Sequence, residues 1–113
     1  MAVACRNDFN VQLTSMNPRD KEILDITQEE CAEVIVAISK ISRFGLDNFK
    51  PGKPKTNRQH LAEELGDLQA MIDLCIVTGV VDKEEVDVAT ENKIAKLKQW
   101  SNIFKDNHEI QSQ

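Results

Sequence analysis

The fold of this chain is decided by two stretches that mix acidic and apolar residues, QEECAEVI at 28–35 and LAEELGDL at 61–68. In both stretches the apolar residues recur at intervals of three and four positions, which is the spacing of one face of an α-helix. The same spacing continues outward from each stretch. We therefore predict two long helices, each with one apolar face.

Capping residues indicate where these helices begin and end. Asn17-Pro18 is a start signal, because Asn caps free backbone amides and Pro fits the first helical position. Gly45 ends the first helix, and Thr56 or Asn57 caps the second, which continues to about Thr78. The predicted loop, residues 46–56, contains two prolines, one glycine and three lysines.

A third helix is predicted after Gly79. Asp82, followed three residues later by Glu85, resembles a capping box, and the helical spacing then continues to about Phe104. Residues 1–16 have weak periodicity and carry no prediction, and the polar last eight residues are expected to fray.

Length and charge narrow the class of protein. The chain has 113 residues and a formal charge of −5, which argues against a nucleic-acid binder with a basic face. No apolar stretch approaches the ~18 residues of a membrane span, and no signal peptide is recognisable. The three cysteines have no metal-ligand spacing. We expect one cytoplasmic all-α domain over residues 1–113, with its core at about 18–104.

Acidic residues interrupt the apolar face of the first predicted helix. With Glu30 at the centre of that face, Glu33 falls about 60° to one side, and Glu29 lies at the edge. The apolar members of the face are Ile23, Ile26, Val34, Ala37 and Ile41.

The second helix repeats this design. Glu64 lies within its apolar face and Asp67 falls about 60° to the side, while Glu63 takes the edge position. The apolar members are Leu61, Leu68, Met71 and Cys75.

Carboxylates on an apolar face need compensation, because a buried and unpaired carboxylate is strongly disfavoured. Two facing helices with acids at this spacing form an all-oxygen cage, which suits Mg²⁺ or Mn²⁺. The alternative is two solvated acidic faces. A di-iron centre is disfavoured, since neither Glu33 nor Glu64 has a His three residues later. His60 is either a surface or capping residue or a neighbour of the site.

The third helix contributes positive charge. Lys93 falls within its apolar face and Lys96 flanks it, with Asn92 farther round. Lys93 either exposes its amine while its stem is buried, or binds phosphate beside a metal. The face itself consists of Val86, Ala89, Leu97, Trp100 and Phe104, of which Trp100 and Phe104 are expected in the core.

Together these residues resemble a known family. QEECAEVI at 28–35, SKISRFG at 39–45 and LAEELGDL at 61–68, with Asn92-Lys93 on a third helix, are similar to the MazG-like all-α nucleoside triphosphate pyrophosphohydrolases. The similarity covers residues 18–104, and the short single module looks like the compact forms carried by bacteriophages.

The resemblance implies Mg²⁺-dependent cleavage of a nucleoside triphosphate between the α and β phosphates, giving a monophosphate and pyrophosphate. Two or three Mg²⁺ ions per site are implied, with Mn²⁺ as a substitute. The implied metal and catalytic residues are Glu29, Glu30, Glu33, Glu64 and Asp67, and the implied phosphate-binding residues are Asn92, Lys93 and Lys96. A homodimer or a dimer of dimers is also implied, in which oligomerisation completes a four-helix-bundle core. The expected location is the cytoplasm, which is that of the host if the chain is phage-encoded.

Substrate choice is the least constrained prediction. Phe44 and Phe49 flank the loop and can face a base, and the side chains of Arg43, Asn57 and His60 can hydrogen-bond a base or sugar. Deoxynucleotides, with a lean to dGTP or dATP, are expected from the phage-like appearance. The rival hypotheses are a phosphoribosyl-ATP pyrophosphohydrolase and a non-catalytic helical adaptor that binds a cation or a basic partner.

Overall fold

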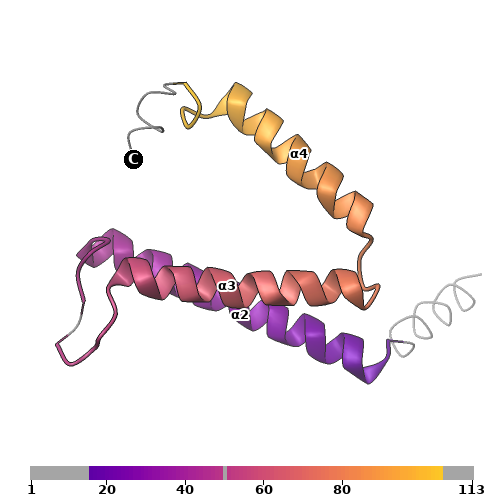
Figure 1. Cartoon of the computed structure of the whole chain (residues 1–113), viewed down its shortest axis with the longest axis horizontal. Helices are drawn as coiled ribbons and strands as arrows, with labels where there is room; N and C mark the ends of the chain where they lie inside the picture. The colour runs from indigo at the N-terminus through magenta and orange to yellow at the C-terminus, as the bar shows by residue number, and fades with distance from the viewer. Residues whose placement is uncertain (1–15, 50, 106–113) are drawn as a thin grey trace, which may run out of the picture. The chain divides into compact units, whose positions relative to one another are not determined.

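The chain is all-helical in the residues that its computed structural model describes, 16–49 and 51–105. Those residues form three helices and no strand: α2 (Pro18–Phe44), α3 (Asn57–Val77) and α4 (Lys83–Trp100) (Figure 1). The predicted all-α class is therefore confirmed. The chain divides into two compact units, Met1–Val80 and Val81–Gln113. Residues 1–15 and the polar tail at 106–113 lie outside the described ranges.

Helix α2 begins and ends at the predicted residues. The Asn17 side chain accepts a hydrogen bond of 2.8 Å from the backbone N–H of Asp20. At the other end, Gly45 has a φ of +96° and its N–H donates to the carbonyl of Ile41 at 2.8 Å. Glycine suits this position because a positive φ is unfavourable for residues that carry a Cβ.

Helix α3 has a stronger N-terminal cap than the sequence analysis predicted. The Thr56 hydroxyl accepts from the N–H of Gln59 at 3.2 Å, and the Gln59 side chain accepts from the N–H of Thr56 at 2.9 Å. This reciprocal capping box satisfies two backbone donors at once. The helix ends at Val77, where the Thr78 hydroxyl donates to the carbonyl of Leu74 at 2.6 Å.

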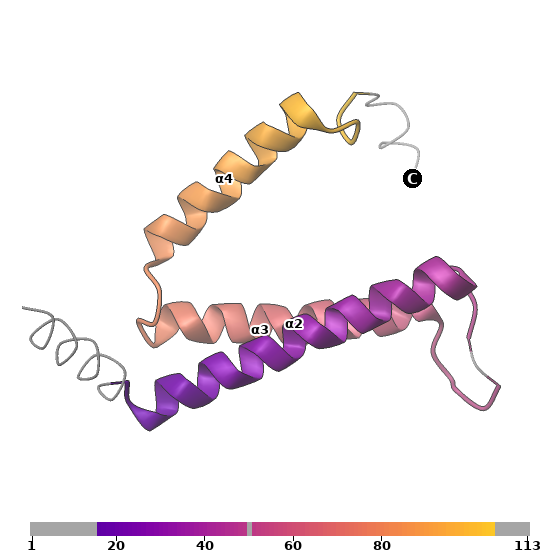
Figure 2. The ribbon, with the colours of Figure 1, turned by 180° about the vertical axis from the view of Figure 1, so that it is seen from behind.

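Helices α2 and α3 form an antiparallel hairpin and lie side by side along their length (Figure 2). The buried cluster joins Ile23 of α2 to Met71 and Cys75 of α3, with Ile26 and Val80 packed against it. All of these residues except Val80, which follows α3, come from the predicted apolar faces, so the predicted facing of the two helices is confirmed.

Helix α4 differs from its prediction at its C-terminal end. It ends at Trp100 rather than about Phe104, because the backbone of Ser101 is extended. Trp100 is 79% exposed. The prediction that Trp100 lies in the core is wrong, because α4 buries none of its own residues.

Within residues 16–49 and 51–105, no helix is long and apolar enough to cross a bilayer.

Candidate metal centre

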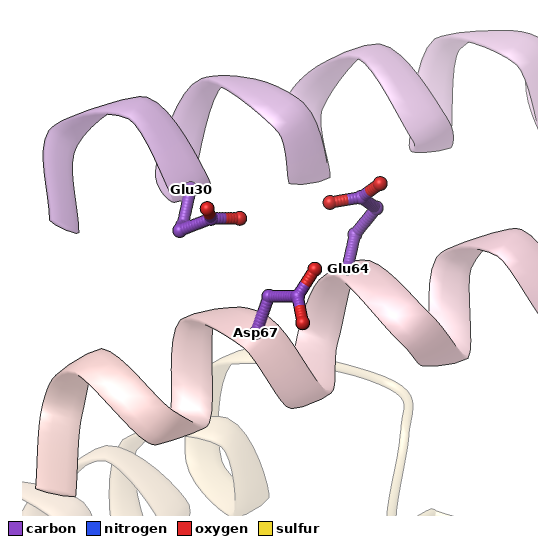
Figure 3. Close-up of side chains that lie close together, drawn as sticks. All are labelled: Glu30, Glu64 and Asp67. Atoms are coloured by element: carbon purple, nitrogen blue, oxygen red, sulfur yellow. The ribbon is translucent and has the colours of Figure 1, made fainter. Parts of the chain in front are cut away.

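Three carboxylates converge between α2 and α3. Glu64 and Asp67 are one turn apart on α3, so their side chains leave the same face of that helix. Glu30 reaches toward them from the facing turn of α2 (Figure 3). One oxygen from each carboxylate lies within 4.8 Å of the others. We call Glu30, Glu64 and Asp67 the acidic triad.

The triad lies at the partly covered edge of the hairpin. Glu30 and Glu64 are half-buried, whereas Asp67 is exposed. Burial raises the pKa of Glu30 above its usual range, and the negative charges of Asp67 and Glu64 raise it further. Repulsion within the triad is therefore one of the causes that favour a protonated Glu30 when no cation is bound.

His60 connects the triad to the first turns of α3. Its Nε2 lies 3.1 Å from Oε1 of Glu64, four residues later on the same helix. The Glu64 side chain is 13% exposed, so this contact occurs in a largely covered position. His60 is thus a neighbour of the triad, while its predicted contact with a base or sugar stays a prediction.

The other predicted acids surround the triad without joining it. Glu29 and Glu33 are exposed on α2 and are not among the three converging carboxylates. Both are close enough for their charges to raise the pKa of Glu30. Their predicted contribution to metal binding remains a prediction. Glu63, at the edge of α3, instead forms an ion pair with Lys55 of the loop.

The predicted phosphate-binding residues lie in the second unit. Asn92, Lys93 and Lys96 are all exposed on α4. Their predicted action on phosphates remains a prediction.

The predicted base-binding residues have structural contacts of their own. The guanidinium of Arg43 lies 4.9 Å from the centre of the Phe44 ring. The Asn57 side chain donates to the carbonyl of Gly45 at 2.9 Å, which ties the start of α3 to the end of α2. Asn57 therefore closes the loop, and its predicted contact with substrate stays a prediction.

A cavity of about 340 Å³ beside the triad was not predicted. Sequence reasoning noted the loop lysines but missed Lys40. That residue lies two helical turns after Glu33 and hence on the same side of α2, so the helical spacing contained the signal. The cavity is lined by Lys40, Lys53, Pro54, Lys55, Asn57, His60 and Glu63.

The donor atoms of the triad fit a hard divalent cation. Three carboxylates offer only oxygen ligands, as Mg²⁺ and Mn²⁺ prefer, and the exposed side at Asp67 leaves room for the waters that Mg²⁺ retains. A cation would also offset the mutual repulsion that raises the pKa of Glu30.

Comparisons with known proteins leave the family open: no protein-family model, no curated protein and no solved structure matches this chain.

Proposed function

We propose that this protein is a Mg²⁺-dependent pyrophosphohydrolase that cleaves a nucleoside triphosphate, with deoxynucleotides as the expected substrates. The convergence of Glu30, Glu64 and Asp67 within 4.8 Å is the observation that carries the proposal. The family resemblance seen in the sequence supplies the reaction class.

The triad has a feature that a solvated acidic surface lacks. Some exposed acids elsewhere in the chain pair with a nearby lysine, as Asp25 does with Lys21 at 2.7 Å. In the triad, by contrast, carboxylates from two helices face one another, and burial contributes to the raised pKa of Glu30. An arrangement that costs free energy in the absence of a cation favours a cation-binding function.

In the proposed reaction, water attacks the α phosphorus and the bond from that phosphorus to the α–β bridging oxygen breaks. The products are a monophosphate and pyrophosphate, and the proton of the water passes to solvent. Glu30, Glu64 and Asp67 would hold and orient the cation, with Glu29 and Glu33 next to them. When bound, Mg²⁺ would neutralise phosphate charge and lower the pKa of water toward neutrality.

We also propose that the hairpin is completed by a second copy of the chain. The described residues bury four hydrophobic side chains, which is little for a folded domain. Meanwhile Ile35 is 67% and Ile38 is 48% exposed on α2, and Val77 is 81% exposed on α3. Two hairpins packed by these faces would form a four-helix bundle. Light scattering is expected to give a dimer or tetramer mass, and a monomer at micromolar concentration would contradict this.

The function is tested by identifying products. The full chain is incubated with each deoxynucleoside triphosphate and Mg²⁺, and the products are separated by anion exchange. We expect monophosphate and pyrophosphate in equal amounts. Phosphoribosyl-ATP is included in the panel, since preferred cleavage of it would favour the rival enzyme.

A matched pair of variants assigns the reaction to the triad. Glu64→Gln removes one charge from the triad, and Glu22→Gln removes one from an exposed position on α2. We expect turnover to fall at least about 100-fold in the first and to stay unchanged in the second. Stepwise release of orthophosphate would overturn the proposed α–β cleavage, and no turnover of any nucleotide would favour a non-catalytic adaptor.

A further inference from the structure

The cavity beside the triad has the opposite charge to the triad itself. Its volume is about 340 Å³, and it is bounded by the end of α2, the loop and the first turns of α3. Three lysines line it, Lys40, Lys53 and Lys55, against a single acid, Glu63. We call it the lysine pocket.

The lysines of this pocket differ in whether they form an ion pair. Lys55 pairs with Glu63, and this interaction holds the pKa of the Glu63 carboxyl below its usual range. Within residues 16–49 and 51–105, neither Lys40 nor Lys53 forms an ion pair. After the internal pair is discounted, the pocket therefore retains two positive charges for a ligand.

The lysine pocket and the acidic triad share His60. That residue lines the pocket, and its Nε2 lies 3.1 Å from Oε1 of Glu64 in the triad. The part of a ligand that extends out of the pocket past His60 would therefore lie at the edge of the acidic triad. Two adjacent sites of opposite charge, one suited to a cation and one to an anion, match a polyphosphate that binds metal at one end.

We propose that the lysine pocket binds the β and γ phosphates of the substrate and holds them as the leaving pyrophosphate. This inference rests on the proposed function for the identity of the whole substrate. Lysine ammonium groups donate hydrogen bonds and accept none, so they suit phosphate oxygens better than the mixed donors and acceptors of a base. The cavity volume of about 340 Å³ leaves room for a phosphate chain.

The pocket is tested by direct binding of inorganic pyrophosphate to the full chain, measured by calorimetry with a chelator present. We expect saturable binding that weakens about tenfold in Lys40→Gln and in Lys53→Gln, because each loses a charge-assisted hydrogen bond. The matched control is Lys21→Gln, roughly 28 Å from Lys40 along the axis of α2, which should bind as the wild type does.

Further measurements separate a pocket for β and γ phosphates from a general attraction of anions. A nucleoside monophosphate should not displace pyrophosphate. With substrate and Mg²⁺, Lys53→Gln should raise KM for the triphosphate more than it lowers kcat. Absence of pyrophosphate binding by the wild type, or equal weakening in Lys21→Gln, would overturn the proposal.

The failure of this inference is distinguishable from the failure of the proposed function. If the wild type produces monophosphate and pyrophosphate but the pocket variants bind pyrophosphate normally, the pocket assignment is wrong and the activity stands. If pyrophosphate binding depends on Lys40 and Lys53 but no nucleotide is cleaved, the anion pocket stands and the proposed reaction is wrong.

Discussion

The α2–α3 hairpin and helix α4 use acidic residues in different ways. In α4, Glu84 and Glu85 lie in the first turn, where free backbone amides and the helix dipole favour negative charge. Farther along, Asp87 forms an ion pair with Lys83, one turn earlier, in which Nζ lies 2.7 Å from Oδ2. Each of these acids has a favourable partner within its own helix.

In the hairpin, the three residues of the acidic triad lie away from the ends of their helices. Glu30 of α2 faces Glu64 and Asp67 of α3 across the interface, and all three lie beyond the reach of either helix dipole. Local helix formation does not explain this placement, and the repulsion between the carboxylates opposes the packing of the two helices. The difference teaches that the position of an acid along a helix separates a stabilising role from a functional one.

The largest expected effect comes from exchanging one acid in each region. Asp67→Asn in the hairpin should reduce nucleotide turnover at least about 100-fold, because it removes a proposed metal ligand. Asp87→Asn in α4 should leave the turnover unchanged. Glu33→Gln is expected to lose turnover as Asp67→Asn does. Steady-state rates are measured beside circular dichroism, which should show unchanged helix content. A near-normal rate in Asp67→Asn would contradict the metal assignment.

Metal binding should stabilise the hairpin through the triad. At a Mg²⁺ or Mn²⁺ concentration of one hundred times Kd, linkage gives about 2.7 kcal/mol, or on the order of 10 °C in Tm. Thermal unfolding with added metal and with a chelator measures this shift. The shift should disappear in Glu64→Gln and persist in Asp87→Asn. The same Tm with added metal and with a chelator would indicate solvated acidic faces.

The pH dependence of stability should reveal the raised pKa of Glu30. Without metal, the folded chain holds this proton more tightly than the unfolded chain does, so the free energy of unfolding should fall as pH rises above the ordinary Glu30 value of 4.5. At pH values above the raised pKa of Glu30, this contribution to the free energy of unfolding is lost completely. Glu63 acts in the opposite sense, because its pKa is lowered by Lys55. The comparison of Glu30→Gln with wild type isolates the triad, and identical profiles would refute the shift.

The smallest effect concerns the helix cap. Thr56→Ala removes the capping box of α3 and should lower the free energy of unfolding by about 1 kcal/mol. The matched control is Thr90→Ala in α4, whose hydroxyl donates to the carbonyl of Val86. That change should stay within about 0.5 kcal/mol. Urea unfolding measures both, and equal losses would show that the cap contributes nothing special.

Much of the hairpin could be predicted from sequence because its signals are local. Asn17, Gly45 and Thr56 act within one turn of the backbone, and the apolar spacing identified Ile23 and Met71 before their burial was seen. The placement of Glu30 on an apolar face likewise follows from helical geometry alone.

The missed features depend on less local information. Helix α4 ends where the backbone of Ser101 becomes extended, and the apolar spacing that continues to Phe104 does not register that change. Trp100 fits the apolar spacing but is exposed, because spacing identifies a face without supplying a partner for it. Lys40 joins Lys53 in one pocket only once the loop has folded back toward α2.

The central claim is tested most directly by following the oxygen of water. The full chain is allowed to hydrolyse a deoxynucleoside triphosphate with Mg²⁺ in water labelled with a heavy oxygen isotope, and both products are analysed by mass spectrometry. Attack at the α phosphorus predicts label in the monophosphate and none in the pyrophosphate. Label in pyrophosphate or orthophosphate, or the absence of labelled product, would contradict the proposed reaction.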